Sequence, residues 1–96
     1  MIKPLYVAVD ATDVTRQKKV HADRVPYDST VRELIEGLVD RMNLPRMDSN
    51  GRELVYHARS ESGGRHLHAS ETVGDSVFPG DSITLQPDIH AGASAR

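Results

Sequence analysis

The amino-acid sequence predicts an α+β domain in which one helix packs across a mixed sheet of four to five strands. The first observation behind this prediction is a stripe of apolar residues between Ser29 and Pro45 that recurs at helical spacing. Such a one-sided stripe is typical of a helix that covers a flat apolar surface. The second observation is that short segments on both sides of it alternate apolar and polar residues, as strands with one buried face do. The stripe consists of Val31, Leu34, Ile35, Leu38, Val39 and Met42.

Local signals mark both ends of the expected helix. Thr30 and Glu33 have the spacing of a capping box, in which side chains and backbone of the first turn satisfy each other's free N–H groups. Pro45 disfavours helical backbone at the residue before it, so we expect the helix to end near Met42 or Asn43.

Two strands are expected before the helix. Residues 5–9 alternate apolar and polar side chains, and residues 18–25 then read as a strand that returns beside them. Val25 is out of phase with Ala22, so we expect a bulge or a strand end near Asp23.

Further short elements are expected after the helix. Pro79–Gly80 has the composition of a type II turn. The segments are a third strand at 52–59, a polar loop at 60–65, a short strand at 66–68, a turn with a little helix at 72–77, and a last strand at 82–86.

The parity of the strands divides their side chains between two faces. We expect the helix stripe to pack on an apolar face made of Leu5, Val7, Tyr56, Ile83 and Leu85. The opposite, open face then carries Val55, His57 and Gln86, and we expect it to be polar.

Composition excludes several classes of protein. A chain of 96 residues makes one domain. Its net charge of −2, with both signs interspersed, and its lack of Trp argue against a nucleic-acid-binding surface. The absence of Cys excludes disulfides, thiolate zinc sites and a cysteine nucleophile. No apolar run approaches the ~20 residues of a membrane span and no signal peptide is evident, so we expect a cytoplasmic protein without membrane partners.

No catalytic motif is evident. The chain has no G-x-S-x-G nucleophile elbow, and Gly63–Gly64 lacks the spaced glycines and the Lys-Ser/Thr of a phosphate-binding loop. We therefore expect neither a serine nucleophile nor a phosphate-binding loop.

The order strand, strand, helix, strand, short strand, strand resembles that of the ubiquitin-like β-grasp family. The resemblance covers nearly the whole chain, from Lys3 to Gly92. VPYDSTVRELIEGL resembles the helix of ubiquitin and the segment before it, RELVYHA resembles its third strand, and SITLQPDIHAG resembles its last strand and tail without a gap. The resemblance implies a β-grasp domain over residues 1–87 followed by a flexible tail over residues 88–96.

The same resemblance implies a function as a protein modifier, which is not an enzyme and needs no cofactor. In this register Ala91–Gly92 lies where the family carries its terminal Gly-Gly. A processing peptidase would expose Gly92, an E1-like activating enzyme would adenylate its carboxylate, and an E2-like conjugating enzyme would deliver it to amines of target proteins. The tail read by these enzymes would be Asp88, Ile89, His90, Ala91 and Gly92, and the extension removed would be Ala93, Ser94, Ala95 and Arg96.

Departures from the family pattern affect the choice of partners. The Gly-Gly pair is absent, and Asp88 stands where ubiquitin has an arginine used in choosing its activating enzyme. Gln86 replaces one member of the apolar recognition patch of ubiquitin. These features resemble a bacterial ubiquitin-like modifier with its own enzymes. The alternatives are a non-covalent β-grasp interaction module, such as a type VII secretion accessory protein, and a sulfur carrier.

The lysines and histidines suggest two further roles. Lys3, Lys18 and Lys19 are candidate acceptors for chain building, although solvated charges at a strand edge are the simpler interpretation. His66 and His68 are two residues apart, and His57 is a candidate neighbour. Zinc needs three or four convergent ligands, so we interpret these histidines as polar sheet side chains and expect no metal site.

Overall fold

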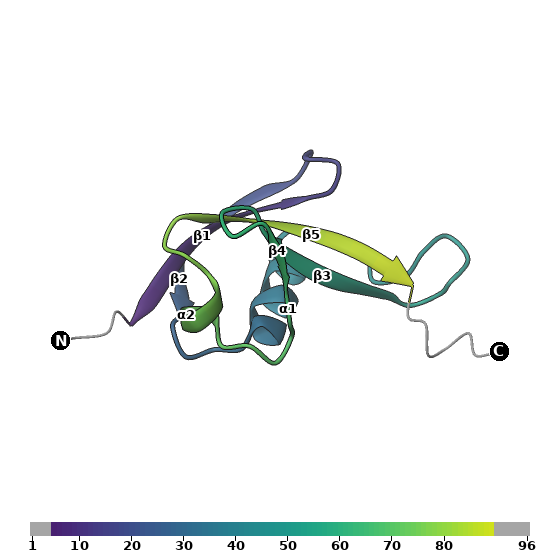
Figure 1. Cartoon of the computed structure of the whole chain (residues 1–96). Helices are drawn as coiled ribbons and strands as arrows, with labels where there is room; N and C mark the ends of the chain where they lie inside the picture. The colour runs from purple at the N-terminus through teal and green to yellow at the C-terminus, as the bar shows by residue number, and fades with distance from the viewer. Residues whose placement is uncertain (1–4, 90–96) are drawn as a thin grey trace.

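In the computed structural model, which describes residues 5–89, the alternating segments form strands and the apolar stripe forms a helix (Figure 1). The strands follow one another across a single sheet in the order β2-β1-β5-β3-β4. β1 and β5 are parallel, and the other neighbours are antiparallel. This is a β-grasp fold, as the sequence predicted. The elements are β1 (Tyr6–Asp13), β2 (Lys19–Pro26), α1 (Val31–Arg41), β3 (Leu54–Ser60), β4 (Arg65–Leu67), α2 (Val73–Ser76) and β5 (Asp81–Ile89).

α1 begins and ends through local hydrogen bonds. The Thr30 hydroxyl accepts from the Glu33 backbone N–H at 3.2 Å, and the Glu33 carboxylate accepts from the Thr30 N–H at 2.9 Å, which confirms the predicted capping box. At the other end Asn43 has a left-handed φ of 53°. The N–H of Leu44 donates to the carbonyl of Val39 at 3.0 Å, so the helix closes with a Schellman-type turn just before Pro45.

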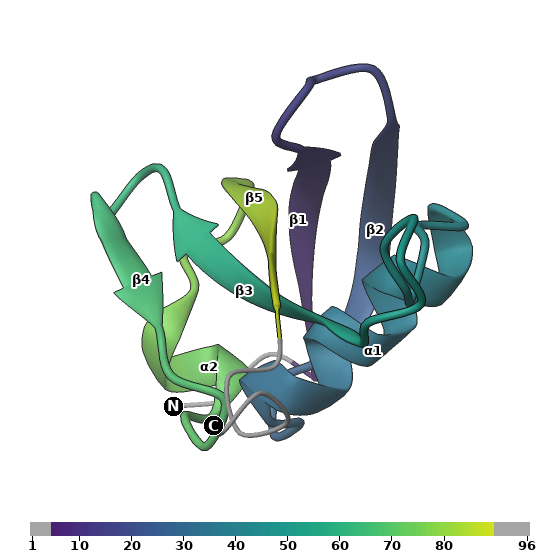
Figure 2. The same ribbon diagram turned by 90° about the vertical axis from the view of Figure 1, so that its right-hand side faces the viewer.

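The helix stripe packs against one face of the sheet and leaves the other face open (Figure 2). Val7, Ile83 and Leu85 are buried under α1, and Tyr56 packs at the margin of this core, as predicted. The prediction for Leu5 is wrong, because β1 begins at Tyr6 and the Leu5 side chain is 78% exposed.

β1 and β2 pair in an antiparallel register that shifts once along their length. Val7 lies opposite Val25 and Val9 lies opposite Ala22, so one residue of β1 faces two residues of β2. The two residues of β2 that face Ala8 are Asp23 and Arg24, so β2 carries one extra residue here, which confirms the bulge predicted from the phase of Val25.

The elements after the helix lie close to their predicted positions. β3, β4 and α2 differ from the expected segments by one or two residues at their ends. Gly80 has a φ of 78°, and the Asp81 N–H donates to the Phe78 carbonyl at 2.9 Å, as the predicted turn at Pro79–Gly80 requires.

β5 is longer than predicted and continues through Pro87 to Ile89. The N–H of Glu61 donates to the Ser82 carbonyl at 2.9 Å, in the same register as the pairing of β3 with β5. Hydrogen-bonded and non-bonded pairs alternate along an antiparallel ladder, so the Tyr56–Pro87 pair is a non-bonded one. Pro87 therefore turns its nitrogen away from β3, and its missing N–H costs the ladder nothing.

Candidate functional surface at the end of β5

The residues predicted to carry the function begin with the last two residues of β5 and continue along the chain from there. Asp88 and Ile89, which the sequence assigned to the tail, are the last residues of this strand and lie opposite Val55 and Leu54. The Asp88 carboxylate is exposed and lies 3.8 Å from the His57 ring nitrogen Nε2. The remaining tail and extension residues, His90, Ala91, Gly92, Ala93, Ser94, Ala95 and Arg96, lie outside the described residues.

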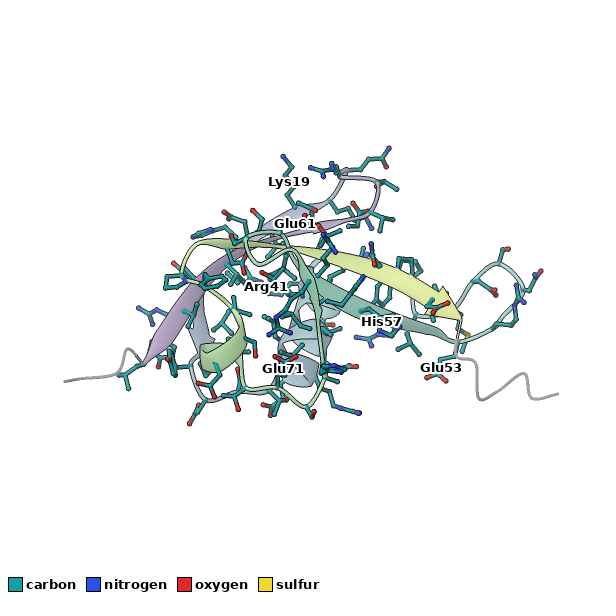
Figure 3. The ribbon with its side chains drawn as sticks, viewed as in Figure 1. Lys19, Arg41, Glu53, His57, Glu61 and Glu71 are labelled. Carbon is teal, nitrogen blue, oxygen red and sulfur yellow. The ribbon has the colours of Figure 1, made fainter. Side chains whose placement is uncertain are left out.

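The open face of the sheet is polar around this point, as predicted (Figure 3). His57 pairs with Gln86 across β3 and β5, and the next pair on this face, Arg59–Thr84, is also polar. Val55 lies opposite Asp88 and is an isolated apolar side chain. Among residues 5–89, this face therefore offers no continuous apolar patch near the end of β5.

Three histidines and Asp88 line one shallow hollow on this face. The pairing of Ala58 with Leu67 puts His68 across from His57, and His66 lies two residues away on the same face. Within residues 5–89, no three His, Asp or Glu side chains are placed so that they could hold a metal ion.

The two described lysines differ in their surroundings. The Lys18 ammonium donates to the Asn43 carbonyl at 3.2 Å, just after the C-terminus of α1, where a cation is favoured. Lys19 is exposed at the start of β2 and projects from the sheet near the β1–β2 hairpin (Figure 3). Lys3 lies outside the described residues.

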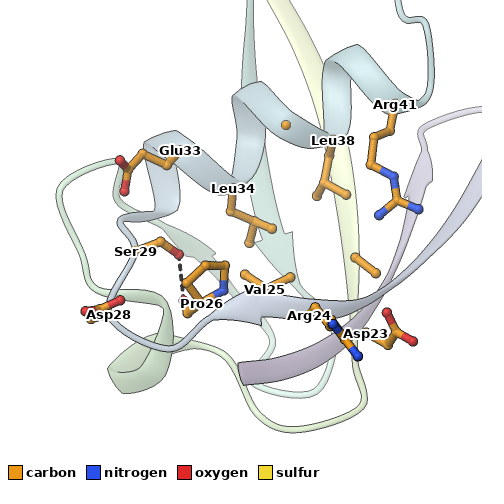
Figure 4. Close-up of a pocket in the computed structure, with 12 residues that line it drawn as sticks. Asp23, Arg24, Val25, Pro26, Asp28, Ser29, Glu33, Leu34, Leu38 and Arg41 are labelled. Atoms are coloured by element: carbon orange, nitrogen blue, oxygen red, sulfur yellow. Dashed lines mark hydrogen bonds between the residues drawn. The ribbon is translucent and has the colours of Figure 1, made fainter. Parts of the chain in front are cut away.

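A groove of about 610 Å³ lies between β2 and α1 (Figure 4). Its floor is apolar and contains Val25, Leu34 and Leu38, and its rim carries charges of both signs. The Arg41 guanidinium reaches the His21 carbonyl at 3.5 Å, and the Ser29 hydroxyl donates to the Pro26 carbonyl at 2.7 Å. Such a groove can receive an apolar side chain of a partner, with the rim charges orienting it.

Sequence reasoning missed the most deeply buried charge in the described part of the chain, which is Asp81. Its side chain is fully buried and accepts from the Ser60 hydroxyl at 2.6 Å and the Ser62 N–H at 3.1 Å. Burial alone would raise the pKa of Asp81, but the hydrogen bonds from Ser60, Ser62 and Phe78 outweigh it and hold the pKa below its usual value. An aspartate after a Pro-Gly turn is usually exposed, so the sequence carried no signal for this role.

A second polar cluster joins β4 to the start of α1. Arg65 and Glu71 form two hydrogen bonds at 2.7 and 3.1 Å, and the Glu71 carboxylate also accepts from the His68 N–H at 2.7 Å. These bonds, led by those from Arg65, lower the pKa of Glu71 to about 2. The carbonyls of Glu71 and Ala69 accept from the first N–H groups of α1, so these donors do not form an anion site.

No family model matches the chain, and no curated protein matches it. In residues 5–89, neither helix has the length and apolar character needed to cross a membrane.

Proposed function

We propose that the chain is a bacterial ubiquitin-like protein modifier that is trimmed after Gly92 and conjugated through the Gly92 carboxylate. Trimming adds water across the Gly92–Ala93 peptide bond, which leaves a carboxylate on Gly92 and a free amine on Ala93. An E1-like enzyme then joins the carboxylate to the AMP part of ATP, which releases pyrophosphate, and transfers the acyl group to a cysteine thiol as a thioester, which releases AMP. An E2-like enzyme passes the acyl group to an amine of the target, which forms an amide bond and releases the thiol. Glycine suits this step because a residue without Cβ can enter a narrow active site.

The observation that carries the proposal is the place of β5 in the sheet. β5 lies between β1 and β3, and its pairing with β3 runs to Ile89. Gly92 follows three residues later, and three extended residues span at most about 10 Å. The Gly92 carboxylate would therefore lie within a short distance of the folded sheet. A modifier that several enzymes bind in turn needs its reactive carboxylate held close to the folded domain in this way.

The surroundings of the tail support dedicated partner enzymes. Asp88 is exposed at the end of β5 and puts a negative charge where ubiquitin has a positive one. An activating enzyme that pairs with this position therefore needs a basic contact. The polar open face beside it does not offer the apolar patch that ubiquitin receptors bind.

The test is intact-mass analysis of the protein from its own cells, combined with two matched variants. Gly92→Glu adds bulk and charge at the reacting carboxylate and should abolish conjugates. Ala95→Glu adds the same charge within the extension, is removed by trimming, and should leave conjugation unchanged. A native chain that keeps Arg96 while its biological function persists would exclude the modifier.

A non-covalent interaction module is the second candidate, and the groove between β2 and α1 is the observation that favours it. Such a module needs no free glycine carboxylate. Its function would survive Gly92→Glu and fail when the groove floor is filled, for example by Gly37→Leu, since the space around Gly37 is open. The modifier predicts loss of function with Gly92→Glu, so this pair of variants separates the two candidates.

A further inference from the structure

The outer edge of β3 is covered by two segments that do not meet. β4 pairs with the second half of this strand, starting at Ala58 (Figure 2). At the start of β3, the N–H of Leu54 donates to the Arg46 carbonyl at 2.9 Å, because the loop after α1 folds back beside the strand. Among residues 5–89, the edge between these two segments, centred on Tyr56, therefore has no strand beside it.

The backbone of Tyr56 points toward this gap. The N–H of Glu61 donates to the Ser82 carbonyl at 2.9 Å, and every second pair of the ladder between β3 and β5 shares this bonded geometry. Val55 and His57 therefore turn their N–H and carbonyl groups toward β5, and Tyr56 turns both of its groups outward. Within the described residues, neither group of Tyr56 has a backbone hydrogen-bond partner. An added strand binds unpaired backbone groups of this kind.

A slot of about 380 Å³ opens at the same place, between α1 and the edge of β3. Ile35 and Val39 of α1 line its apolar side, Leu54 and Tyr56 line it from β3, and Ala69 lies at the end next to β4. Paired residues of neighbouring strands have their side chains on the same face of a sheet. A residue paired with Tyr56 would therefore direct its side chain toward α1 and into the apolar part of this slot.

The charges at the rim of the slot favour an acidic group. Arg46 and Glu36 form an ion pair at 3.4 Å. Arg32 is exposed in the first turn of α1, and its backbone N–H donates to the Ala69 carbonyl at 3.0 Å, so it lies at that end of the slot. In the described part of the chain, the Arg32 guanidinium forms no ion pair. Glu53 lies at the opposite end, by the start of β3.

The gap is short, and this limits what can enter it. Three positions of β3 lie between Leu54 and Ala58, which corresponds to about 10 Å of extended chain. An edge strand such as β2 of a second copy, with 8 residues, is too long for it. The occupant is therefore a short exposed segment of another protein.

We propose that this slot docks a short segment of a partner protein in which an apolar residue lies within two positions of an acidic one. The carbonyl of the apolar residue accepts from the Tyr56 N–H, its N–H donates to the Tyr56 carbonyl, and its side chain packs against Ile35 and Val39. The acidic residue pairs with Arg32. Backbone hydrogen bonds supply affinity in such an arrangement, and the side chains supply specificity. The slot does not involve Gly92, so this inference goes beyond the proposed function and is tested separately from it.

The probes are three capped peptides of glycine and serine that differ in a central pair of residues. The first carries leucine and aspartate, the second leucine and lysine, and the third alanine and aspartate. Each is titrated into the full-length chain, and binding is followed by NMR shifts of the backbone amides. We expect the leucine–aspartate peptide to shift the Tyr56 and Ala69 amides and to bind about fivefold more tightly than either of the others.

Two matched pairs of variants assign the contacts, and all four natural residues are exposed, so each variant should keep the fold. Arg32→Glu should reverse the preference between aspartate and lysine, whereas Arg24→Glu, on the rim of the other groove, should not. Ala69→Leu fills the end of the slot and should abolish the shift at Tyr56. Gly37→Leu fills the groove between β2 and α1 and should leave that shift unchanged.

Three results of the titrations would overturn the proposal. The first is the absence of binding at millimolar peptide. The second is equal binding of the three peptides. The third is a set of shifts confined to the groove between β2 and α1 or to the open face of the sheet.

Hydrogen exchange on the free chain tests the edge without any variant. The amides of Val55 and His57 face β5, and that of Leu54 is bonded to the loop after α1, so these three should be protected. The Tyr56 amide should exchange about tenfold faster or more, and it should slow when the leucine–aspartate peptide is bound. A protected Tyr56 amide in the free chain would show that the edge is already occupied, by the chain itself if sedimentation finds a monomer and by a second copy if it finds a dimer. Either result would overturn the proposal.

Discussion

Replacement of Asp81 by Ala removes the buried carboxylate that joins the start of β5 to the loop after β3. The variant leaves two donors without their acceptor: the Ser60 hydroxyl, which is buried, and the Ser62 N–H, which is part-buried. An orphaned buried donor costs about 1–3 kcal/mol and a part-buried one costs less, so we expect the free energy of unfolding to fall by about 2–4 kcal/mol. That is a large fraction of the ~5–15 kcal/mol that stabilises a domain of this kind.

Two further variants identify the cause of the loss. Asp81→Asn keeps one acceptor oxygen and should cost about half as much, about 1–2 kcal/mol. Asp40→Ala changes the net charge in the same way at an exposed position of α1 and should stay within about 0.5 kcal/mol of the natural chain. The free energies come from denaturant melts at pH 7.

The pH dependence supplies an independent check. The pKa of Asp81 in the folded chain lies below its usual value of 3.8, so its ionised form stabilises the fold fully above that value. This contribution is lost as the pH falls through the folded pKa. The gap between the natural chain and Asp81→Asn should therefore be constant from about pH 5 to 8 and narrow below about pH 4. A loss below about 0.5 kcal/mol for Asp81→Ala, or a gap that persists unchanged at pH 3, would refute the reasoning.

Further variants test the core, the loop cluster and the open face. Leu38→Ala should destabilise the chain by about 2–5 kcal/mol in a denaturant melt, because Leu38 is 2% exposed under the sheet, and a change below about 0.5 kcal/mol would contradict this packing. Glu71→Gln should lower the free energy of unfolding at pH 7. Because the pKa of Glu71 in the folded chain, about 2, lies below its usual 4.5, the difference in stability between this variant and the natural chain should shrink as the pH falls from 4.5 toward 2. A difference that stays constant in denaturant melts over this pH range would argue against the Arg65–Glu71 pair. Gly74→Ala would place a methyl group against the Tyr27 ring and should cost about 1–3 kcal/mol, an effect that Tyr27→Leu in the same chain should reduce if the clash is the cause. NMR titration with ubiquitin-binding domains should show no tight binding to the polar open face, and saturable shifts on β3 and β5 would overturn that expectation.

Local patterns in the sequence were sufficient for the helix and for the two faces of the sheet. The spacing of Val31 to Met42 determines which side of α1 is apolar, and Thr30 with Glu33 marks its first turn through contacts three residues apart. The phase of Val25 likewise predicted a bulge that the register confirms. These features depend on neighbours along the chain, and a sequence contains that information directly.

The candidate site was predicted only in part. The polar character of His57 and Gln86 followed from strand parity, and their pairing across β3 and β5 is as expected. Gly92 was located by resemblance to ubiquitin, and it lies outside the described residues. The contact of Lys18 with Asn43 had no signal, because it joins the β1–β2 hairpin to the end of a helix 25 residues away.

Tertiary structure alone decided the features that depend on coverage by distant strands. The last strand was expected to end at residue 86, yet β5 passes through Pro87. β1 pairs with β5 only as far as Leu85, so among residues 5–89 no strand covers the side to which the Pro87 nitrogen turns. Leu5 carries the parity of a core residue but lies just outside β1, so the sheet does not cover it. Asp81 is buried because Ser60 and Ser62 meet it from β3 and the loop that follows, about 20 residues earlier in the chain. In each case the sequence determines the residue's intrinsic preference, and only the packed sheet determines whether water, a backbone strand or a hydrogen-bond donor lies beside it.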